Sequence, residues 1–317
     1  MNQKTDVIII GAGPVGLFAI FELGLLNLKC HLIDNLDKIG GQCSELYPEK
    51  PIYDIPARPS ITGQELTDEL MKQAKPFNPI FHLNQQAEKI VKTEDGWELT
   101  TSNNVTILAK CIVIAAGAGS FVPRKLPIEN IDQFENKSVL YAIRNKSLLN
   151  GKKIIIAGGG DSALDWTNNL AESAEVTLIH RRKEFRAAPD SVSKMLALEK
   201  QGKVNFEIGQ IVSVVEENGI LSGVKIKNDD TNKLIETNFL LPFFGLKMEL
   251  GPIANWGLNL NENLIEVDTE KFETSIKSIF AIGDINTYPG KLKLILSGFH
   301  EAALMAQQCF KYCFPDK

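Results

Sequence analysis

The stretch VIIIGAGPVG, residues 7–16, decides the fold of this 317-residue chain. Its first four residues are apolar and β-branched, which is typical of a buried parallel strand. The glycines that follow have the spacing Gly-x-Gly-x-x-Gly, and the next segment, LFAIFELGLLNLK, has the apolar spacing of a helix. A second strand, CHLID, then ends at Asp34. This order of strand, glycine turn, helix, strand and acid is typical of a βαβ unit that binds a dinucleotide.

The three glycines and the acid have separate tasks in such a unit. Gly11 permits the tight turn, Gly13 lets the backbone approach a pyrophosphate, and Gly16 allows the helix to pack closely on the strand. Free N–H groups at the start of the helix stabilise the pyrophosphate. Asp34, 23 residues beyond Gly11, is placed to accept hydrogen bonds from a ribose diol. The first unit therefore suits a dinucleotide with an unphosphorylated ribose, such as FAD.

The pattern occurs a second time, with one change. KKIIIA, residues 152–157, predicts another buried strand, and GGGDSA, residues 158–163, follows it as a glycine turn whose third small residue is alanine. After a helix, the second strand of this unit ends in IHRRKEFRA, residues 179–187. Where the first unit has Asp34, this unit has arginines, and guanidinium groups pair bidentately with a 2′-phosphate that an acid would repel. The unit is predicted to bind NADP(H); the alternative is a solvated basic loop.

One chain with both units implies a flavin that exchanges hydride with a nicotinamide. Two further predicted strands, in AKCIVIAAGAGSF (residues 109–121) and SIFAIGD (residues 278–284), flank the FAD in flavoproteins with two dinucleotide domains. The predicted fold class is α/β, with two nucleotide-binding Rossmann-like domains of three layers (ββα). The NADP-binding domain, residues 122–242, is inserted into the FAD-binding domain, residues 1–121 and 243–317.

The composition excludes several other classes of protein. A formal net charge of −5 and a pI near 5.6 argue against general affinity for nucleic acid. The apolar runs are too short to span a membrane, and the polar start has no secretory or twin-arginine pattern, so we expect a cytoplasmic protein. Five scattered cysteines form neither a Cys-x-x-Cys pair nor a metal-ligand pattern, which predicts reduced thiols and no metal site. Cys43 is expected to be structural, and Cys309 and Cys313 to be unpaired small apolar residues.

With these motifs placed, the chain resembles the thioredoxin-reductase-like family of bacterial ferredoxin–NADP⁺ reductases (type 2) over nearly its whole length. The segments that carry the resemblance are IGGQCSELYPEKPIYDIPA, GGGDSALDW, HRRKEFRA, LLPFFGLK, LGPIANWGL and GDINTYPGKLKLILSGFHEA. Thioredoxin reductases share both glycine turns but carry a Cys-x-x-Cys just before the second one's strand. The corresponding stretch here, SVLYAIRNKSLLNGKK, residues 138–153, contains no cysteine. A reductase without this dithiol cannot pass electrons to thioredoxin by exchange.

The resemblance implies an FAD-dependent oxidoreductase that transfers hydride between NADPH and one non-covalent FAD per chain. Single electrons then pass to ferredoxin or flavodoxin. It also implies a cytoplasmic homodimer with no nucleic-acid or membrane partner, and no catalytic side chain, because the flavin carries the chemistry. Two alternatives stay open: a flavin-dependent disulfide or quinone reductase, and a non-catalytic sensor of flavin and nucleotide.

The same resemblance assigns residues to two sites. The predicted FAD contacts are Gly11, Gly13, Pro14, Val15, Gly16, Asp34, Gln42, Tyr47, Ala87, Phe121 and Asp284. The predicted NADP contacts are Gly158, Gly160, Asp161, Ser162, Ala163, His180, Arg181, Arg182 and Arg186. A basic patch that docks an acidic ferredoxin is predicted at Lys50, Arg58, Lys291 and Lys293, with solvated surface cations as the alternative. Family members continue past the last helix into a tail that covers the flavin; this sequence ends at Lys317, so no residue is assigned to that contact.

Overall fold

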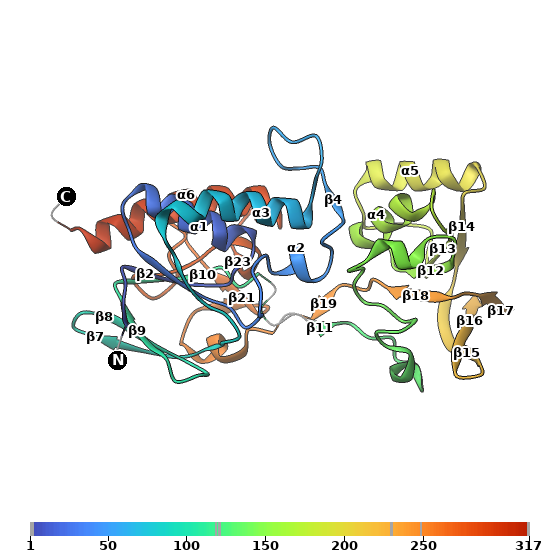
Figure 1. Cartoon of the computed structure of the whole chain (residues 1–317), viewed down its shortest axis with the longest axis horizontal. Coiled ribbons are helices and arrows are strands. Elements are labelled where there is room, and N and C mark those ends of the chain that lie inside the picture. Colours follow the sequence, from blue (N-terminus) through green and yellow to red (C-terminus); the bar gives the residue numbers. More distant parts are fainter. Residues whose placement is uncertain (1–2, 118, 120–121, 229–230, 248, 316–317) are drawn as a thin grey trace. The chain divides into compact units, whose positions relative to one another are not determined.

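A computed structural model describes residues 3–117, 119, 122–228, 231–247 and 249–315. The chain divides into two compact units (Figure 1): unit 1 is Met1–Phe121 with Met248–Lys317, and unit 2 is Val122–Lys247. The predicted return to unit 1 was after residue 242, but in the structure the chain returns after residue 247. The reason is a short antiparallel pair within unit 2, formed by β11 (Val122–Pro123) and β19 (Leu246–Lys247).

Unit 1 is built around a five-stranded parallel sheet with the strand order β22–β10–β2–β3–β6. The strands are β2 (Val7–Ile10), β3 (Cys30–Ile33), β6 (Ile80–His82), β10 (Cys111–Ile114) and β22 (Ile279–Ala281). Every residue of β2, β3, β10 and β22 is buried. This burial explains the unbroken apolar run of β2 and β10, because a parallel sheet is covered on both faces.

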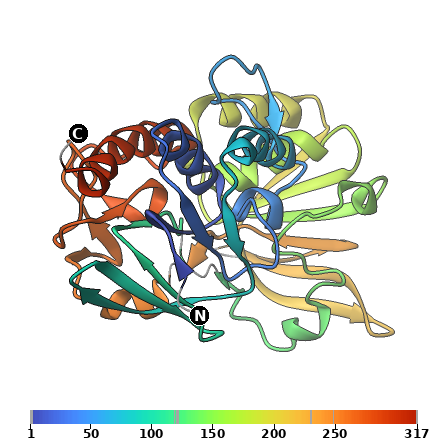
Figure 2. The same ribbon diagram turned by 60° about the vertical axis from the view of Figure 1, so that its left-hand side comes forward.

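Three layers make up unit 1. Helices α1 (Pro14–Leu25), α3 (Gly63–Ala74) and α6 (Ile295–Cys313) cover one face of the sheet, as Figures 1 and 2 show. The other face is covered by a four-stranded sheet of β1 (Gln3–Lys4), β7 (Ala87–Thr93), β8 (Gly96–Thr101) and β9 (Thr106–Ala109). Alternate residues of β2 enter different cores: Val7 and Ile9 pack with the helices, and Ile8 and Ile10 pack with the second sheet. The predicted three-layer α/β organisation is confirmed.

Short elements connect these layers in unit 1. They are α2 (Gln42–Glu45), β4 (Pro51–Ile52), β5 (Ile61–Thr62), η1 (Lys75–Phe77), η4 (Gly251–Asn255), β20 (Leu260–Asn261), β21 (Leu264–Glu266), η5 (Gly283–Ile285) and β23 (Asn286–Thr287). Helix α3 begins with a capping box, in which Thr62 and Glu65 exchange side-chain to backbone hydrogen bonds and satisfy the first N–H groups of the helix.

Unit 2 repeats the same layers on a smaller scale. Its parallel sheet has the order β14–β13–β12–β18. The strands are β12 (Lys153–Ala157), β13 (Glu175–His180), β14 (Val204–Ile208) and β18 (Phe239–Pro242). Helices α4 (Asp161–Leu170) and α5 (Pro189–Lys200) lie on one face, and the antiparallel strands β15 (Gln210–Glu217), β16 (Ile220–Asn228) and β17 (Thr231–Glu236) lie on the other (Figure 1). Two 3₁₀ turns, η2 (Ile131–Phe134) and η3 (Lys146–Leu149), precede β12.

No helix within the described residues is long and apolar enough to cross a membrane.

Candidate functional site

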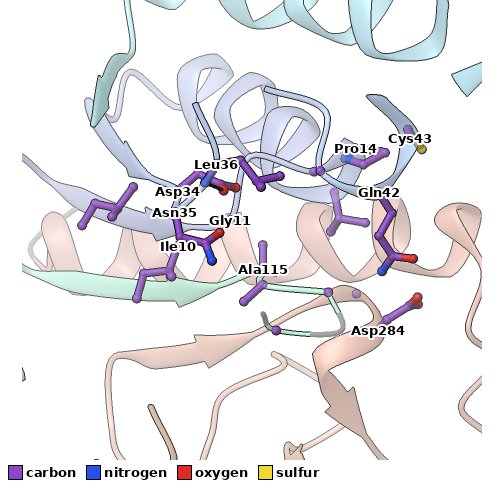
Figure 3. A pocket seen from close by; sticks show the side chains of 18 of the residues that line it. Ile10, Gly11, Pro14, Asp34, Asn35, Leu36, Gln42, Cys43, Ala115 and Asp284 are labelled. Carbon is purple, nitrogen blue, oxygen red and sulfur yellow. Dashed lines mark hydrogen bonds between the residues drawn. The ribbon is translucent and has the colours of Figure 1, made fainter. Parts of the chain in front are cut away.

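A pocket in unit 1 opens at the carboxyl ends of β2, β3, β10 and β22, which is where open α/β sheets bind ligands. The predicted FAD contacts that line it are Gly11, Gly13, Pro14, Val15, Asp34, Gln42, Tyr47, Ala87 and Asp284. Figure 3 shows Asp34 at one end of the pocket and Asp284, with Gln42 near it, at the other. Phe121 lies outside the described residues. The fold therefore gathers into one cavity residues that are up to 273 positions apart (Gly11 to Asp284).

The three glycines of the turn at this pocket have different surroundings. Gly11 has a φ of +110°, and a Cβ there would lie 2.3 Å from the backbone oxygen of Ala115. A Cβ on Gly16 would lie 1.9 Å from the backbone oxygen of Gly11, so Gly16 is a packing residue behind the pocket and is not on its wall. A Cβ on Gly13 would meet nothing within 4 Å. The turn thus leaves open space beside the helix N-terminus, which fits a pyrophosphate group.

Asp34 has a structural task that was not predicted. Its side chain is buried, and its Oδ2 accepts a hydrogen bond from the N–H of Ala12 at 2.6 Å, while Oδ1 accepts one from the N–H of Leu36 at 2.8 Å. Burial raises the pKa of this carboxyl, and the two backbone hydrogen bonds act in the opposite direction. Asp34 therefore fixes the glycine turn against the next loop, and it also lines the pocket.

The opposite end of the pocket contains three titratable groups. Burial raises the pKa of Asp284, although the charges of Lys291 and Lys293 lower it. Burial raises the pKa of the Cys43 thiol to about 12 and the pKa of the Tyr47 hydroxyl well above 10. A thiol that stays protonated is a poor nucleophile, in agreement with a structural role for Cys43.

Glu301 holds the segment that carries Asp284, and no sequence motif indicated this residue. This fully buried carboxylate of α6 accepts hydrogen bonds at Oε2 from the N–H of Gly283 (2.6 Å) and from Nδ2 of Asn286 (2.9 Å). Its Oε1 accepts from the Tyr288 hydroxyl (2.9 Å) and from Nζ of Lys291. All four donors belong to the connection between β22 and α6. The only sequence signal is an acid placed among the small and apolar residues of the buried face of α6.

This ion pair corrects the predicted basic patch. The Lys291 side chain is 6% exposed and is bonded to Glu301, so Lys291 is a buried structural cation. Arg58 lies 3.6 Å from a carboxylate oxygen of Glu69, and Lys50 lies 5.6 Å from the ring centroid of Tyr47. Lys293 is exposed. The four residues therefore have four different surroundings and do not form one set of exposed cations.

A second pocket, in unit 2, lies at the carboxyl ends of β12, β13 and β18. The predicted NADP contacts that line it are Gly158, Gly160, Asp161, Ser162, His180, Arg181, Arg182 and Arg186. Ala163 is buried behind the turn, with its Cβ 3.0 Å from the position that a Cβ on Gly158 would take. As at Gly13, a Cβ on Gly160 would meet nothing within 4 Å. The two glycine turns therefore have matching shapes.

The cationic loop after β13 is fastened to this glycine turn. The N–H of Arg186 donates to the backbone oxygen of Gly159 (2.8 Å), and the N–H of Ala188 donates to Oδ1 of Asp161 (2.7 Å). The ring of His180 lies so close to Gly159 that a Cβ there would be 2.3 Å from it. These contacts fix the backbone on both sides of the arginine side chains.

His180 serves this loop mainly as a brace. Its ring stacks on Phe185, with centroids 5.3 Å apart, and Nε2 donates a hydrogen bond to the backbone oxygen of Glu184 (3.2 Å). Burial and the charges of Arg182, Arg181 and Arg186 lower the pKa of this imidazole, whereas the hydrogen bond to Glu184 raises it. His180 therefore lines the pocket with a ring that is already occupied by protein contacts.

The arginine side chains have no such engagement. Arg181, Arg182 and Arg186 are exposed and form no ion pair within the described part of the chain. Guanidinium groups without a carboxylate partner, on a protein with a net charge of −5, are available to an anionic ligand. The pocket also contains residues that were not predicted as NADP contacts: Arg124, Leu126, Pro127, Gln210, Ile211, Phe243, Phe244 and Gly245.

All five cysteines are in unit 1, and all are free thiols. Cys30, Cys43, Cys111 and Cys309 are buried, and Cys313 is half-buried. Unit 2, where a thioredoxin reductase carries its dithiol, therefore has no thiol at all. Within the described residues, no group of three or more His, Cys, Asp or Glu side chains is arranged to hold a metal ion.

Known proteins resemble this chain over its whole length. The family described as "Pyridine nucleotide-disulphide oxidoreductase" matches residues 5–305. A ferredoxin–NADP reductase of Parvibaculum lavamentivorans is 62% identical and covers 100% of this chain and 94% of its own length. That of Nitrobacter winogradskyi is 57% identical over 99% of this chain and 93% of its own. Among solved structures, the thioredoxin reductases of T. acidophilum and Lactococcus lactis share the fold of this chain, with TM-scores of 0.85 and 0.84. Each is 23% identical in sequence, and each match covers 98% of this chain and 99% of the other chain.

Proposed function

Because the chain belongs to the pyridine nucleotide-disulphide oxidoreductase family, and within it to the ferredoxin–NADP reductases, we propose that it is an NADPH-dependent flavoprotein that reduces ferredoxin or flavodoxin. One observation carries the proposal. The end of the second strand of unit 1 carries the carboxylate of Asp34, the corresponding place in unit 2 carries arginines that form no ion pair among the described residues, and unit 2 contains no thiol. The two sites thus suit different dinucleotides. Unit 2 also lacks the dithiol that would transfer electrons to thioredoxin by thiol–disulfide exchange.

FAD would be held in the pocket of unit 1, one per chain and without a covalent bond. The open space at Gly13 would receive its pyrophosphate, Asp34 its adenosine ribose, and Asp284 and Gln42 the flavin half. When bound, FAD would supply the chemistry that links hydride transfer from NADPH to single-electron transfer to ferredoxin. The side chains of this pocket bind and orient the cofactor, and none is assigned a proton-transfer step.

NADP(H) would bind in the pocket of unit 2 as a co-substrate. The glycine turn with Asp161 and Ser162 would lie at the pyrophosphate, and Arg181, Arg182 and Arg186 at the 2′-phosphate. These arginines are exposed and form no ion pair among the described residues, which supports this assignment because their charge is not neutralised by a carboxylate of the protein.

We also propose that the enzyme works in the cytoplasm as a homodimer. The five free cysteines support a reducing compartment. The homodimer follows from the family resemblance.

The decisive experiment is a reductase assay on the purified protein, after flavin absorbance has been verified. NADPH-dependent reduction of cytochrome c should rise with added ferredoxin and saturate. Ferredoxin could instead leave the rate unchanged while a quinone or a thioredoxin-coupled disulfide is reduced faster. That result would favour a flavin-dependent disulfide or quinone reductase. A bound flavin that NADPH leaves oxidised would instead indicate a nucleotide sensor.

A further inference from the structure

We propose that Arg124 binds the phosphate on the nicotinamide side of the NADP(H) pyrophosphate. It would be a dinucleotide contact separate from the arginines at the 2′-phosphate. The inference rests on the proposed function and adds a residue that lies 57 positions before Arg181 and belongs to neither glycine-turn motif.

The order of the strands places Arg124 at the far side of the pocket. The strands run β13–β12–β18, so the arginines after β13 and residues 243–245 after β18 flank the glycine turn after β12. The N–H of Arg124 donates to the backbone oxygen of Gly245 (3.1 Å), which fixes it at the β18 side. Since neighbouring strands are about 4.8 Å apart, roughly 10 Å of sheet edge separates this side from the end of β13.

A dinucleotide has to extend in this direction. If its 2′-phosphate lies at Arg181 and Arg182 and its pyrophosphate lies at the glycine turn, the rest of the molecule continues toward β18. Its second phosphate is then the anion that passes closest to the β18 side. Arginine suits this anion because its planar, permanently charged group offers paired N–H donors to phosphate oxygens.

The adjacent residue gives a contrast within the same loop. Nζ of Lys125 forms ion pairs with Glu135 (2.7 Å) and Asp132 (3.3 Å) and does not line the pocket. The Arg124 side chain is exposed, lines the pocket, and forms no ion pair in the described part of the chain. Of two neighbouring cations, one is therefore used by the protein and the other is presented to the cavity.

Backbone contacts make Arg124 a defined contact rather than a mobile surface charge. The strand pair of β11 and β19 ends directly before it, and the hydrogen bond to Gly245 continues that pairing by one residue. An arginine on a fixed backbone loses less entropy when it binds a phosphate than one on a free loop.

The test is calorimetric titration of the FAD-loaded protein with two ligands, NADP⁺ and adenosine 2′,5′-bisphosphate. The second ligand keeps the 2′-phosphate but lacks the nicotinamide-side phosphate. Arg124→Ala should weaken NADP⁺ binding about 10- to 100-fold, the usual range for one hydrogen-bonded charge pair, and leave the bisphosphate unchanged. Arg124→Lys should recover part of the loss, because the charge remains and the paired donors do not.

Lys125→Ala is the matched control, because it removes the same charge from the next residue. It should change neither affinity by more than about twofold. The inference is overturned if Arg124→Ala leaves NADP⁺ binding unchanged, if it weakens both ligands equally, or if it lowers only the ferredoxin-dependent rate. A wild-type protein that binds neither ligand would instead overturn the proposed function, so the two failures are distinguishable.

Discussion

The two glycine turns of this molecule have matching shapes and contrasting surroundings. Gly13 and Gly160 both leave open space at the start of a helix. At the end of the second strand, unit 1 has a buried carboxylate that accepts two backbone hydrogen bonds, and unit 2 has exposed guanidinium groups that form no ion pair among the described residues. In dinucleotide-binding βαβ units generally, the glycine turn receives the pyrophosphate and the end of the second strand receives the ribose, so the two units are expected to differ in the ribose that they accept.

The contrast extends to how strongly each pocket is fixed. In unit 1, Glu301 binds four donors of the segment that carries Asp284, at the centre of a buried network. In unit 2, the cationic loop is fixed by its backbone, while the arginine side chains stay in solvent. We infer that the first arrangement suits a resident cofactor and the second a co-substrate that exchanges in each turnover.

The strongest way to break this comparison is to remove the arginines of unit 2. In Arg181→Ala/Arg182→Ala, kcat/KM for NADPH should fall about 100-fold or more, because two charge-assisted phosphate contacts are lost. The value for NADH should change little, and the bound flavin should be unaffected. Steady-state kinetics with both nucleotides checks this. Equal losses with NADPH and NADH would show that these arginines do not read the 2′-phosphate.

Breaking the buried ion pair of unit 1 should have the next largest effect. Glu301→Gln leaves the ammonium of Lys291 buried without a counter-charge, which should cost about 3–5 kcal/mol of stability. Urea unfolding followed by flavin release measures it. Glu236→Gln is the matched control in unit 2, since Glu236 pairs with Lys153 on an exposed surface, and it should change stability little. Equal effects of the two substitutions would contradict the structural role of Glu301.

The pH dependence of stability should differ between the units. His31 and His82 of unit 1 are buried, and their ring nitrogens lie 3.0 Å apart; burial lowers the pKa of both, and for His31 the neighbouring His82 lowers it further. Below about pH 6.5 these histidines are protonated in the unfolded chain more readily than in the folded protein. The stability that the neutral pair contributes is therefore full above about pH 6.5 and is lost as the pH falls below that value.

Unit 2 has one histidine with a lowered pKa, the half-buried His180, and should lose less stability over the same pH range. Thermal unfolding is measured between pH 5 and 8, with flavin release as the signal for unit 1 and NADP⁺ affinity as the signal for unit 2. The comparison shows which unit loses more stability in acid. In His82→Gln, the acid sensitivity of unit 1 should shrink. A pH profile that this substitution leaves unchanged would rule out the pair as its source.

The smallest expected effect is that of thiol reagents. Burial raises the pKa of Cys30, Cys43 and Cys309, and a protonated buried thiol reacts slowly. The folded protein should release at most the signal of one half-buried thiol, Cys313, to a chromogenic disulfide, and the unfolded protein that of five. Ferredoxin reduction should survive the treatment. Loss of activity with one equivalent of reagent would point to a catalytic thiol and to the alternative reductase.

Several features of both pockets could be predicted because they depend only on residues that are close together in the sequence. A turn that needs a positive φ at Gly11, or close packing at Gly16, restricts the residue type at one position, and the strand and helix beside it have their own periodicity. Arg181 and Arg182 follow a predicted strand, so their place at the sheet edge follows from the strand alone. The same holds for Asp34.

Other features could not be read from the chain, because they depend on which segments meet. Lys291 stands in KLKLIL like a surface lysine, and only the packing of α6 against the connection after β22 makes it a buried partner of Glu301. Arg124 has no motif around it, and its backbone hydrogen bond to Gly245 holds it at the pocket of unit 2. The boundary after residue 247 likewise depends on the pairing of β11 with β19.

Sequence alone was sufficient to predict the two βαβ units, the residue type at the end of each second strand and the absence of a dithiol in unit 2, because these depend on local backbone geometry and residue type. The tertiary structure alone decided which charges are buried and paired and which are presented to a cavity. The reason is physical: the free energy of a charge depends on its desolvation and on partners that are distant in the chain, and neither is set until the segments pack.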